Sequence, residues 1–131
     1  MKRSKAREEM MSILFQMEGQ GDFDVDNKAH YFHGKKFGNH TEYCEKVYSL
    51  ACNKKEEIDK AISDNSNKWK INRIPKTDLA ILRLATIEIL YMEEIPEAVS
   101  INEAVELSKV YCDDNAGSYI NGILGSIGKN K

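Results

Sequence analysis

The sequence has few of the features that mark a secreted, membrane-bound or disulfide-stabilised protein. Only three cysteines occur in 131 residues, at positions 44, 52 and 112, and none belongs to a C-x-x-C pair. The N-terminus lacks an apolar stretch followed by a small-residue cleavage site. The most apolar segment, DLAILRLATIEILYM, is interrupted by Arg83 and Glu88 and is too short to span a bilayer. These absences predict a cytoplasmic protein with reduced cysteines and no membrane association.

Motifs for catalysis or cofactor binding are also missing. The chain has no G-x-S-x-G element, no glycine-rich phosphate loop and no cysteine–histidine pairing that the sequence could support. Four residues of the types that bind zinc lie close together, at His30, His33, His40 and Cys44. Their spacing matches none of the usual zinc patterns, and exposed histidines with a core cysteine are the simpler interpretation. We therefore predict neither an enzyme nor a metal or cofactor site.

No convincing run of alternating apolar and polar residues is present, and the apolar periodicity is helical nearly throughout. We expect an all-α fold of about seven helices, forming one domain over residues 1–131. The first helix has a single apolar stripe, formed by Ala6, Met10, Ile13, Leu14 and Met17. Residues 79–90 are apolar on almost every side, so this helix should lie at the centre of the protein.

Two charges interrupt the central apolar helix. Arg83 and Glu88 are five residues apart, which places them on different helix faces. A buried charge needs a partner, so each is expected to form its own ion pair with another part of the chain. We interpret both as structural residues.

Local signals predict where several helices begin. Two pairs have the spacing of a capping pair, Asn39 with Glu42 and Ser100 with Glu103. Pro75 suits a first helical turn, and Asp78 then lies near the positive end of the helix dipole.

Two further signals concern packing near the C-terminus. The small residues Gly122 and Gly125 would permit close contact between the last helix and a neighbour. In the preceding helix, Val105, Leu107 and Val110 are expected to face the core.

Acidic residues are absent from the first seven positions, which hold the four cations Lys2, Arg3, Lys5 and Arg7. The whole chain has 19 basic and 21 acidic residues, so the rest of it carries a net charge of −6. A helix start is the positive end of its dipole, and cations there cost about 0.3–1 kcal/mol each. This asymmetry favours a local anion site, and the alternative is a solvated, frayed terminus.

Two aromatic residues could contribute to binding nucleic acid. Unpaired RNA bases commonly stack on aromatic rings while Arg and Lys bind the phosphates. Phe15 lies eight residues after Arg7, close to the same helix face two turns on, although it could equally be the edge of the core. Tyr119 follows the polar run CDDNAGS and is the better candidate for an exposed ring.

Four segments resemble, in order and spacing, the NusB family of bacterial transcription antitermination factors: KAREEMMSILFQME, DLAILRLATIEIL, VSINEAVELSKVY and SYINGILGSI. The similarity covers residues 2–18 and about 69–127. The combination of INEAVELSK with YINGIL behind AILRLA is its most specific part. The resemblance implies two small helical bundles packed roughly at right angles.

The resemblance also implies a function. Family members bind boxA, a single-stranded RNA element in nascent ribosomal RNA, together with NusE, a ribosomal protein that also acts as a transcription factor. The pair loads onto RNA polymerase and suppresses premature termination. By this resemblance, Asp78 would contact NusE. The implied RNA-binding residues, with Lys2 added from the charge pattern, are Lys2, Arg3, Lys5, Arg7, Phe15 and Tyr119.

The sequence leaves several alternatives open. Ser4 and Ala116 depart from common family residues, so RNA affinity could be weaker or depend more on NusE. If all four N-terminal cations bind phosphates, the log–log salt slope should be about −3. The second possibility is a protein-interaction or homodimeric scaffold module without its own RNA role, and the sequence does not distinguish a monomer from a homodimer.

Overall fold

The computed structural model describes residues 1–67 and 70–131, and these residues form seven α-helices and three short 3-10 turns. The α-helices are α1 (Arg3–Gln20), α2 (Lys28–Phe32), α3 (Thr41–Asn53), α4 (Lys55–Asp64), α5 (Lys76–Tyr91), α6 (Glu97–Tyr111) and α7 (Ala116–Asn130). The 3-10 turns are η1 (Val25–Asn27), η2 (Gly38–His40) and η3 (Ile71–Arg73). No strand occurs in the described part of the chain, which confirms the predicted all-α class.

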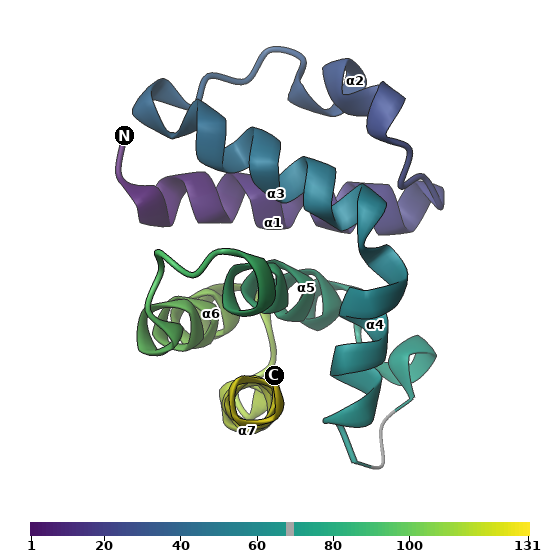
Figure 1. The fold of residues 1–131 in the computed structure, drawn as a ribbon, viewed down its shortest axis with the longest axis vertical. Coiled ribbons are helices and arrows are strands. Elements are labelled where there is room, and N and C mark those ends of the chain that lie inside the picture. Colours follow the sequence, from purple (N-terminus) through teal and green to yellow (C-terminus); the bar gives the residue numbers. More distant parts are fainter. Residues whose placement is uncertain (68–69) are drawn as a thin grey trace.

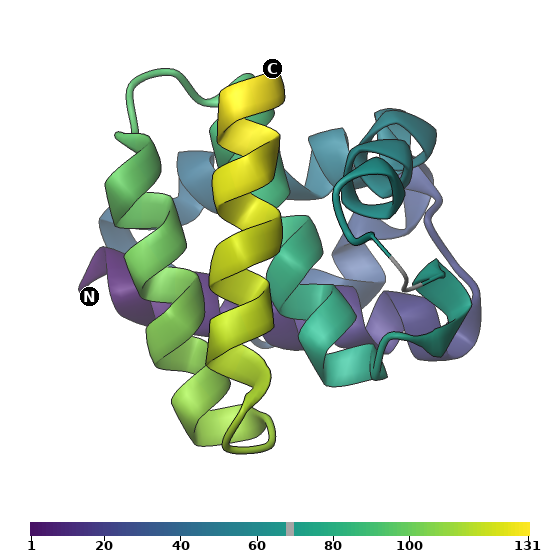
Figure 2. The same ribbon diagram turned by 90° about the horizontal axis from the view of Figure 1, so that it is seen from below.

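The helices form two layers that cross. In Figure 1, α1 and α3 run across the view, whereas α5, α6 and α7 are seen end-on below them. In the view turned by 90°, α6 and α7 run side by side and α1 crosses behind them (Figure 2). Helix α5 contacts α1, α3, α4, α6 and α7, so it lies at the centre, as predicted. The arrangement is the pair of perpendicular bundles that the resemblance implies.

The apolar periodicity correctly predicts the buried face of α1. All five residues of the predicted stripe are fully buried, namely Ala6, Met10, Ile13, Leu14 and Met17. The helix ends where Gly21 adopts a left-handed conformation with φ of 63°, which glycine adopts without steric cost. The N–H of the next residue, Asp22, then donates to the carbonyl of Met17 at 2.9 Å and closes the helix.

The central helix is buried along almost its whole length. Every residue from 78 to 89 in α5 is inaccessible or nearly so, including two charged residues inside the apolar run. In the described residues, no helix has both the length and the apolar character needed to cross a membrane.

Glu88 is the most deeply buried of these charges, at 1% exposed, and its carboxylate accepts hydrogen bonds from three other helices. Arg7 on α1 donates from Nε at 2.8 Å and from Nη2 at 3.0 Å. Ser100 on α6 donates at 2.8 Å, and the Tyr43 hydroxyl on α3 also donates. A buried carboxylate is tolerated only when it is paired in this way. Glu88 therefore connects α1, α3 and α6 to α5.

The second buried charge, Arg83, connects α5 to the other end of α1 and to α4. Its Nε and Nη2 atoms donate to the two carboxylate oxygens of Asp59 at 2.8 and 3.0 Å. Its Nη1 atom donates to Glu18 at 2.6 Å. The prediction that Arg83 and Glu88 have separate structural partners is confirmed.

The predicted capping box of α6 is wrong. The helix begins at Glu97, immediately after Pro96, so Ser100 lies one turn inside it. Ser100 donates to Glu88, and Glu103 accepts a hydrogen bond from Arg7 Nη1 at 3.1 Å. Ser100 and Glu103 thus bond to residues of other helices and do not cap α6.

The predicted capping pair of α3 is also wrong. Helix α3 begins at Thr41, and Asn39 lies before it in η2. The flanking residue His40 makes no side-chain capping bond. The Thr41 hydroxyl instead donates back to the carbonyl of Gly38 at 3.0 Å.

Two glycines other than the predicted pair allow α6 and α7 to approach closely. Nothing lies within 4 Å of where a Cβ would stand at Gly122 or Gly125. A Cβ at Gly117 would lie 3.3 Å from a serine hydroxyl of α6, and one at Gly128 would lie 2.5 Å from the Glu97 carboxylate. Residues 117 and 128 are three helical turns apart and share a face, whereas residue 122 lies more than 90° away. The glycine pattern alone did not reveal which face of α7 is covered.

Helix α6 buries small residues and leaves its larger apolar ones nearer the surface. Its buried face consists of Ser100, Ala104 and Ser108. Val105 and Leu107 are half-buried, and Val110 is 70% exposed, so the prediction that Val110 faces the core is wrong.

The buried pair predicts a large effect of changing Arg7. In Arg7→Gln, Glu88 would keep its burial and lose the guanidinium, and breaking a buried pair in this way costs about 3–5 kcal/mol. We expect the free energy of unfolding, measured by urea denaturation followed by circular dichroism, to fall by about that amount. Lys5→Gln is the matched control on the same helix, because the Lys5 side chain is exposed, and its midpoint should hardly move. An Arg7→Gln protein as stable as the wild type would contradict this role.

Candidate nucleic-acid interface

The start of α1 presents positive charge to solvent and has no acidic residue in its first turn. Lys2 is exposed and forms no ion pair within the described residues. Arg3 donates from Nε to Nδ1 of His40 at 3.0 Å, and its guanidinium lies 4.3 Å from the centre of the Tyr43 ring. An imidazole nitrogen that accepts a hydrogen bond carries no proton, so neither partner cancels the charge of Arg3.

Lys5 is exposed but already paired with carboxylates of its own helix. Its ammonium lies 2.9 Å from Glu8 and 3.8 Å from Glu9. The hydrogen bond from Lys5 to Glu8 raises the pKa of Lys5. The Tyr111 hydroxyl donates to Glu8 at 2.6 Å, and this bond, together with that of Lys5, lowers the pKa of Glu8. A ligand of Lys5 would therefore compete with Glu8.

Arg7 is not among the cations that the start of α1 presents to solvent. Its guanidinium is buried, with the residue 5% exposed, and is fully engaged by Glu88 and Glu103. The prediction that Arg7 binds RNA phosphates is corrected accordingly. Its side chain follows the buried stripe of α1, since Arg7 lies three and seven residues before Met10 and Leu14.

Phe15 lies at the surface, in a groove of about 410 Å³. The groove is lined by α1, by the start of α5 and by the end of α6. Its side chain is 44% exposed, as is that of Tyr111, which lines the same groove. The rim carries Lys5 and Lys35, and Thr77 closes the groove on the α5 side. Two accessible rings beside two ammonium groups are the chemistry that holds unpaired bases and their phosphates.

Asp78 is mostly buried at the start of α5. It is 5% exposed, and its carboxylate accepts a hydrogen bond from the Tyr119 hydroxyl. Burial and a hydrogen bond to Asp78 raise the pKa of the neighbouring Cys112 thiol to about 12. Asp78 thus connects the start of α5 to the start of α7. This is a correction to its expected position as an accessible contact residue.

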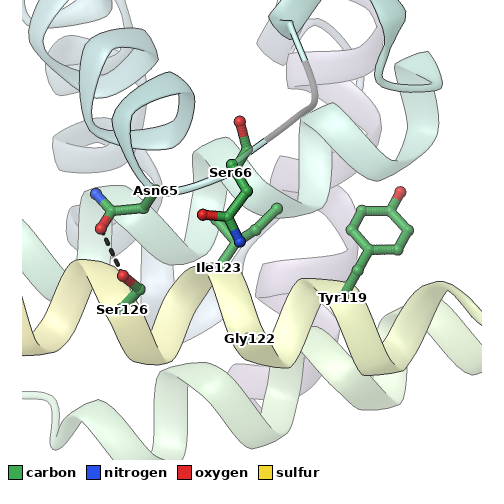
Figure 3. Close-up of a pocket in the computed structure, with 7 residues that line it drawn as sticks. Asn65, Ser66, Tyr119, Gly122, Ile123 and Ser126 are labelled. Atoms are coloured by element: carbon green, nitrogen blue, oxygen red, sulfur yellow. Dashed lines mark hydrogen bonds between the residues drawn. The ribbon is translucent and has the colours of Figure 1, made fainter.

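Tyr119 is half-buried and lies between two hollows on the same side of α7. One hollow, of about 210 Å³, also exposes parts of Arg73, Asp78 and Asn115. The other, of about 670 Å³, runs along α7 past Gly122 and Ser126 (Figure 3). At its far end the Ser126 hydroxyl donates to the Asn65 side chain at 2.6 Å.

The first turn of α5 separates the two aromatic residues. Thr77 lines the groove that contains Phe15, and the adjacent Asp78 holds the hydroxyl of Tyr119. The predicted aromatic pair therefore lies on either side of one helix start. Of the predicted RNA-binding residues, Lys5 and Phe15 line one groove and Tyr119 lines the hollows on the other side of this turn, while Lys2 and Arg3 precede Lys5 at the start of α1.

The four candidate zinc ligands do not converge. The described residues contain no group of three His, Cys, Asp or Glu side chains able to hold a metal ion. His30 packs edge-on against Tyr31, and His40 contacts Arg3 and the Met1 carbonyl. Cys44 is fully buried, and burial raises the pKa of its thiol to about 12, which disfavours the thiolate that a metal needs.

The NusB family model matches residues 4–129 of the chain. The chain belongs to the NusB family. Transcription antitermination protein NusB of Alkaliphilus oremlandii is 47% identical over 126 residues, which cover 95% of this chain and 91% of that protein. The NusB of Clostridium novyi is 40% identical, with 97% and 98% covered. The resemblance seen in the sequence is confirmed, and with it the assignment to transcription antitermination.

Solved NusB structures share the fold. A structure of T. maritima NusB superimposes with a TM-score of 0.87 at 32% identity, covering 98% of this chain and 92% of that one. A chain in the crystal structure of the antitermination factors NusB and NusE in complex with dsRNA superimposes with a TM-score of 0.84 at 25% identity, covering 98% and 97%.

Sequence reasoning missed several residues of this NusB-family surface. Lys35 and Tyr111 line the Phe15 groove, and Arg73 lines a hollow beside Tyr119. The paired lysines of the HGKKF segment were a visible signal for Lys35. Tyr111 and Arg73 reach the surface only through the tertiary arrangement, which no local pattern encodes.

The Tyr119–Asp78 bond predicts that the Tyr119 hydroxyl contributes to stability. Tyr119→Phe would keep the ring and remove the donor to a buried carboxylate, at a cost of about 1–3 kcal/mol. We expect the free energy of unfolding to fall by that amount in urea denaturation. Tyr111→Phe is the control, because the Tyr111 hydroxyl donates to Glu8 at the exposed surface. This variant should unfold at nearly the wild-type midpoint. Equal midpoints for both variants would argue against the structural role of the Tyr119 hydroxyl.

Proposed function

We propose that this chain binds boxA single-stranded RNA of nascent ribosomal RNA together with NusE, and so suppresses premature termination by RNA polymerase. The proposal extends the family assignment to a specific RNA and partner. The protein would act in the cytoplasm as one RNA-binding domain over residues 1–131, without catalysing a reaction. A solved relative was crystallised as NusB and NusE with dsRNA, which supports looking for the same types of partner here.

The observation that carries the proposal is the surface around the first turn of α5. Phe15 and Tyr119 lie on either side of that turn, and Lys2, Arg3 and Lys5 continue the surface toward the start of α1. Aromatic rings can stack with bases, and cations can follow the phosphates. The aromatic rings favour a single strand over a duplex, because they can stack only with unpaired bases.

The start of α1 would itself favour a phosphate. A helix start presents N–H groups without intrahelical partners and the positive end of the dipole. Here that end has no acidic residue to satisfy it, and Lys2 at the cap position contributes no capping bond. A bound phosphate would supply the missing negative charge. The cations at this position would then be unfavourable only in the free protein.

NusE would contact the surface near the start of α5. The buried Asp78 would act mainly by holding Tyr119, with only its edge open to a hollow of about 210 Å³. The partner would meet the residues around that hollow, among them Arg73 and Asn115. This assignment makes Asp78 a positioning residue for both ligands.

With Arg7 inside the protein, three N-terminal cations remain for phosphate binding. Their expected log–log salt slope is about −2, at about −0.7 per contact for a single strand. Changing Lys2, Arg3 and Lys5 together to Gln should flatten the slope by about 2 and weaken binding. Fluorescence anisotropy of a labelled boxA RNA across a salt series, with and without purified NusE, measures both effects.

Two controls make this experiment specific. A variant with Lys54, Lys60 and Lys129 changed to Gln loses the same charge from the residue before α4, from α4 and from α7, away from the start of α1, and should keep the wild-type slope. A duplex of the same sequence tests whether unpaired bases are needed. Unchanged affinity and slope in the N-terminal variant would refute the RNA-binding role of these cations.

A protein-interaction or homodimeric scaffold is the second candidate, and the carboxylates Glu8 and Glu9 in the Phe15 groove favour it. In that case the groove would bind a protein segment, and boxA RNA would not associate in the absence of NusE. Light scattering with and without RNA distinguishes the two functions. A stable dimer that gains no mass with RNA would favour the scaffold.

A further inference from the structure

The segment between α2 and α3 lies against the start of α1. Figure 1 shows the chain crossing from α2 back to the start of α3, near the N-terminus. Residues 33–37, which we call the basic loop, contain Lys35 and Lys36. At the far end of this crossing, His40 contacts the Met1 carbonyl at 2.9 Å, and a Cβ at Gly38 would lie 3.7 Å from the Met1 side chain.

The basic loop has a defined conformation. Gly34 adopts a left-handed conformation with φ of 74°, which turns the chain after α2. Phe37 is 4% exposed and packs edge-on against Phe32, with ring centres 5.1 Å apart. These two anchors fix the ends of the loop, and Lys35 between them reaches Glu9 on α1.

The charges of the basic loop and of α1 meet at Glu9. Lys35 lies 3.0 Å from one Glu9 oxygen, and Lys5 lies 3.8 Å from the other. Glu8 and Glu9 together balance Lys5 and Lys35. Lys36, the next residue, is exposed and forms no ion pair within the described residues. The loop therefore adds one unbalanced positive charge next to the residue that contacts α1.

We propose that the basic loop is a second binding edge for the RNA phosphate backbone, in which Lys36 contacts a phosphate directly and Lys35 exchanges Glu9 for one. This inference rests on the RNA-binding role proposed above and extends it to the loop that borders the Phe15 groove through Lys35. A strand bound here would pass between the loop and the N-terminal cations before it reaches the Phe15 groove. Phosphate contacts of this kind add affinity but carry no sequence information.

Glu9 has the opposite effect in this arrangement. Its carboxylate competes with phosphates for Lys35 and Lys5, so it weakens RNA binding in general. Bases stacked on aromatic rings would be little affected, because they do not depend on these ammonium groups. Glu9 therefore disfavours RNA that offers only a backbone, which makes it a specificity-determining residue.

The test compares single charge changes in the full chain. Lys36→Gln should weaken binding of a labelled boxA RNA about fourfold near 0.15 M salt and flatten the log–log slope by about 0.7, the contribution of one phosphate contact. Lys129→Gln is the matched control, since Lys129 is also exposed and without an ion pair in the described residues but lies at the end of α7. It should leave both quantities unchanged.

Glu9→Gln provides a test with the opposite sign. It should tighten binding of boxA RNA and tighten binding of an abasic single strand, which has phosphates but no bases to stack, by a larger factor. A misfolded variant cannot produce tighter binding, so this result would support the proposal independently of stability. Urea denaturation of each variant verifies that the fold is kept.

Each outcome leads to a decision. In one outcome, the wild type binds RNA through Lys2, Arg3 and Lys5, while Lys36→Gln matches Lys129→Gln and Glu9→Gln binds no more tightly than the wild type. In that case the basic loop has no part in binding. This inference then fails, and the proposed function stands. If the wild type binds neither strand with or without NusE, both fail together.

Discussion

The arrangement of the two bundles depends on how the protein neutralises one carboxylate at the centre of α5. Glu88 is almost completely buried, and its donors Arg7, Tyr43 and Ser100 come from α1, α3 and α6. A charge at this depth is strongly unfavourable unless it is paired and hydrogen-bonded. All its donors are in place only when the three helices have taken their positions around α5. The ion pair thereby specifies the crossing of the bundles, in addition to what apolar packing provides.

One ring links this buried pair to the surface charge. The hydroxyl of Tyr43 donates to Glu88, and the face of the same ring lies under the Arg3 guanidinium. Burial and the charge of Glu88 raise the pKa of Tyr43, so its hydroxyl remains a donor at neutral pH. Arg3 is thus oriented by an aromatic ring and by His40 rather than by an acid. This is how a chain with net charge −2 keeps an uncompensated cation at the start of α1.

The sequence was sufficient to predict burial where the periodicity of apolar residues determines it. It was insufficient where burial depends on a partner from another helix. The stripe of α1 and the burial of α5 follow from the spacing of apolar residues, and both were predicted. In the sequence Arg7 looked equivalent to Arg3, because composition does not show how deeply a side chain is buried. Its position three residues before Met10, in register with the buried stripe, was a signal that it turns inward toward a charge such as Glu88.

The failed capping predictions have a related cause. A Ser-x-x-Glu pattern can satisfy the first turn of its own helix, or it can point the same two side chains toward other helices. The helix cap lies at Pro96, four residues before the cap that the pattern predicts, and this leaves Ser100 and Glu103 free to bind the Arg7–Glu88 pair. Likewise, the exposed position of Phe15 depends on where α5 begins relative to α1, which local sequence does not encode.

The balance of charge around α1 limits what electrostatics can contribute to binding. Lys5 and Lys35 are held by carboxylates of their own surface, and screening reduces the reach of the remaining cations to about 8 Å at physiological ionic strength. Attraction over long distances is therefore weak, and binding has to come from contacts at close range. Those contacts converge on the first turn of α5, where Thr77 faces the Phe15 groove and Asp78 holds Tyr119. Adjacent residues of one helical turn thus contribute to both sides of the candidate interface.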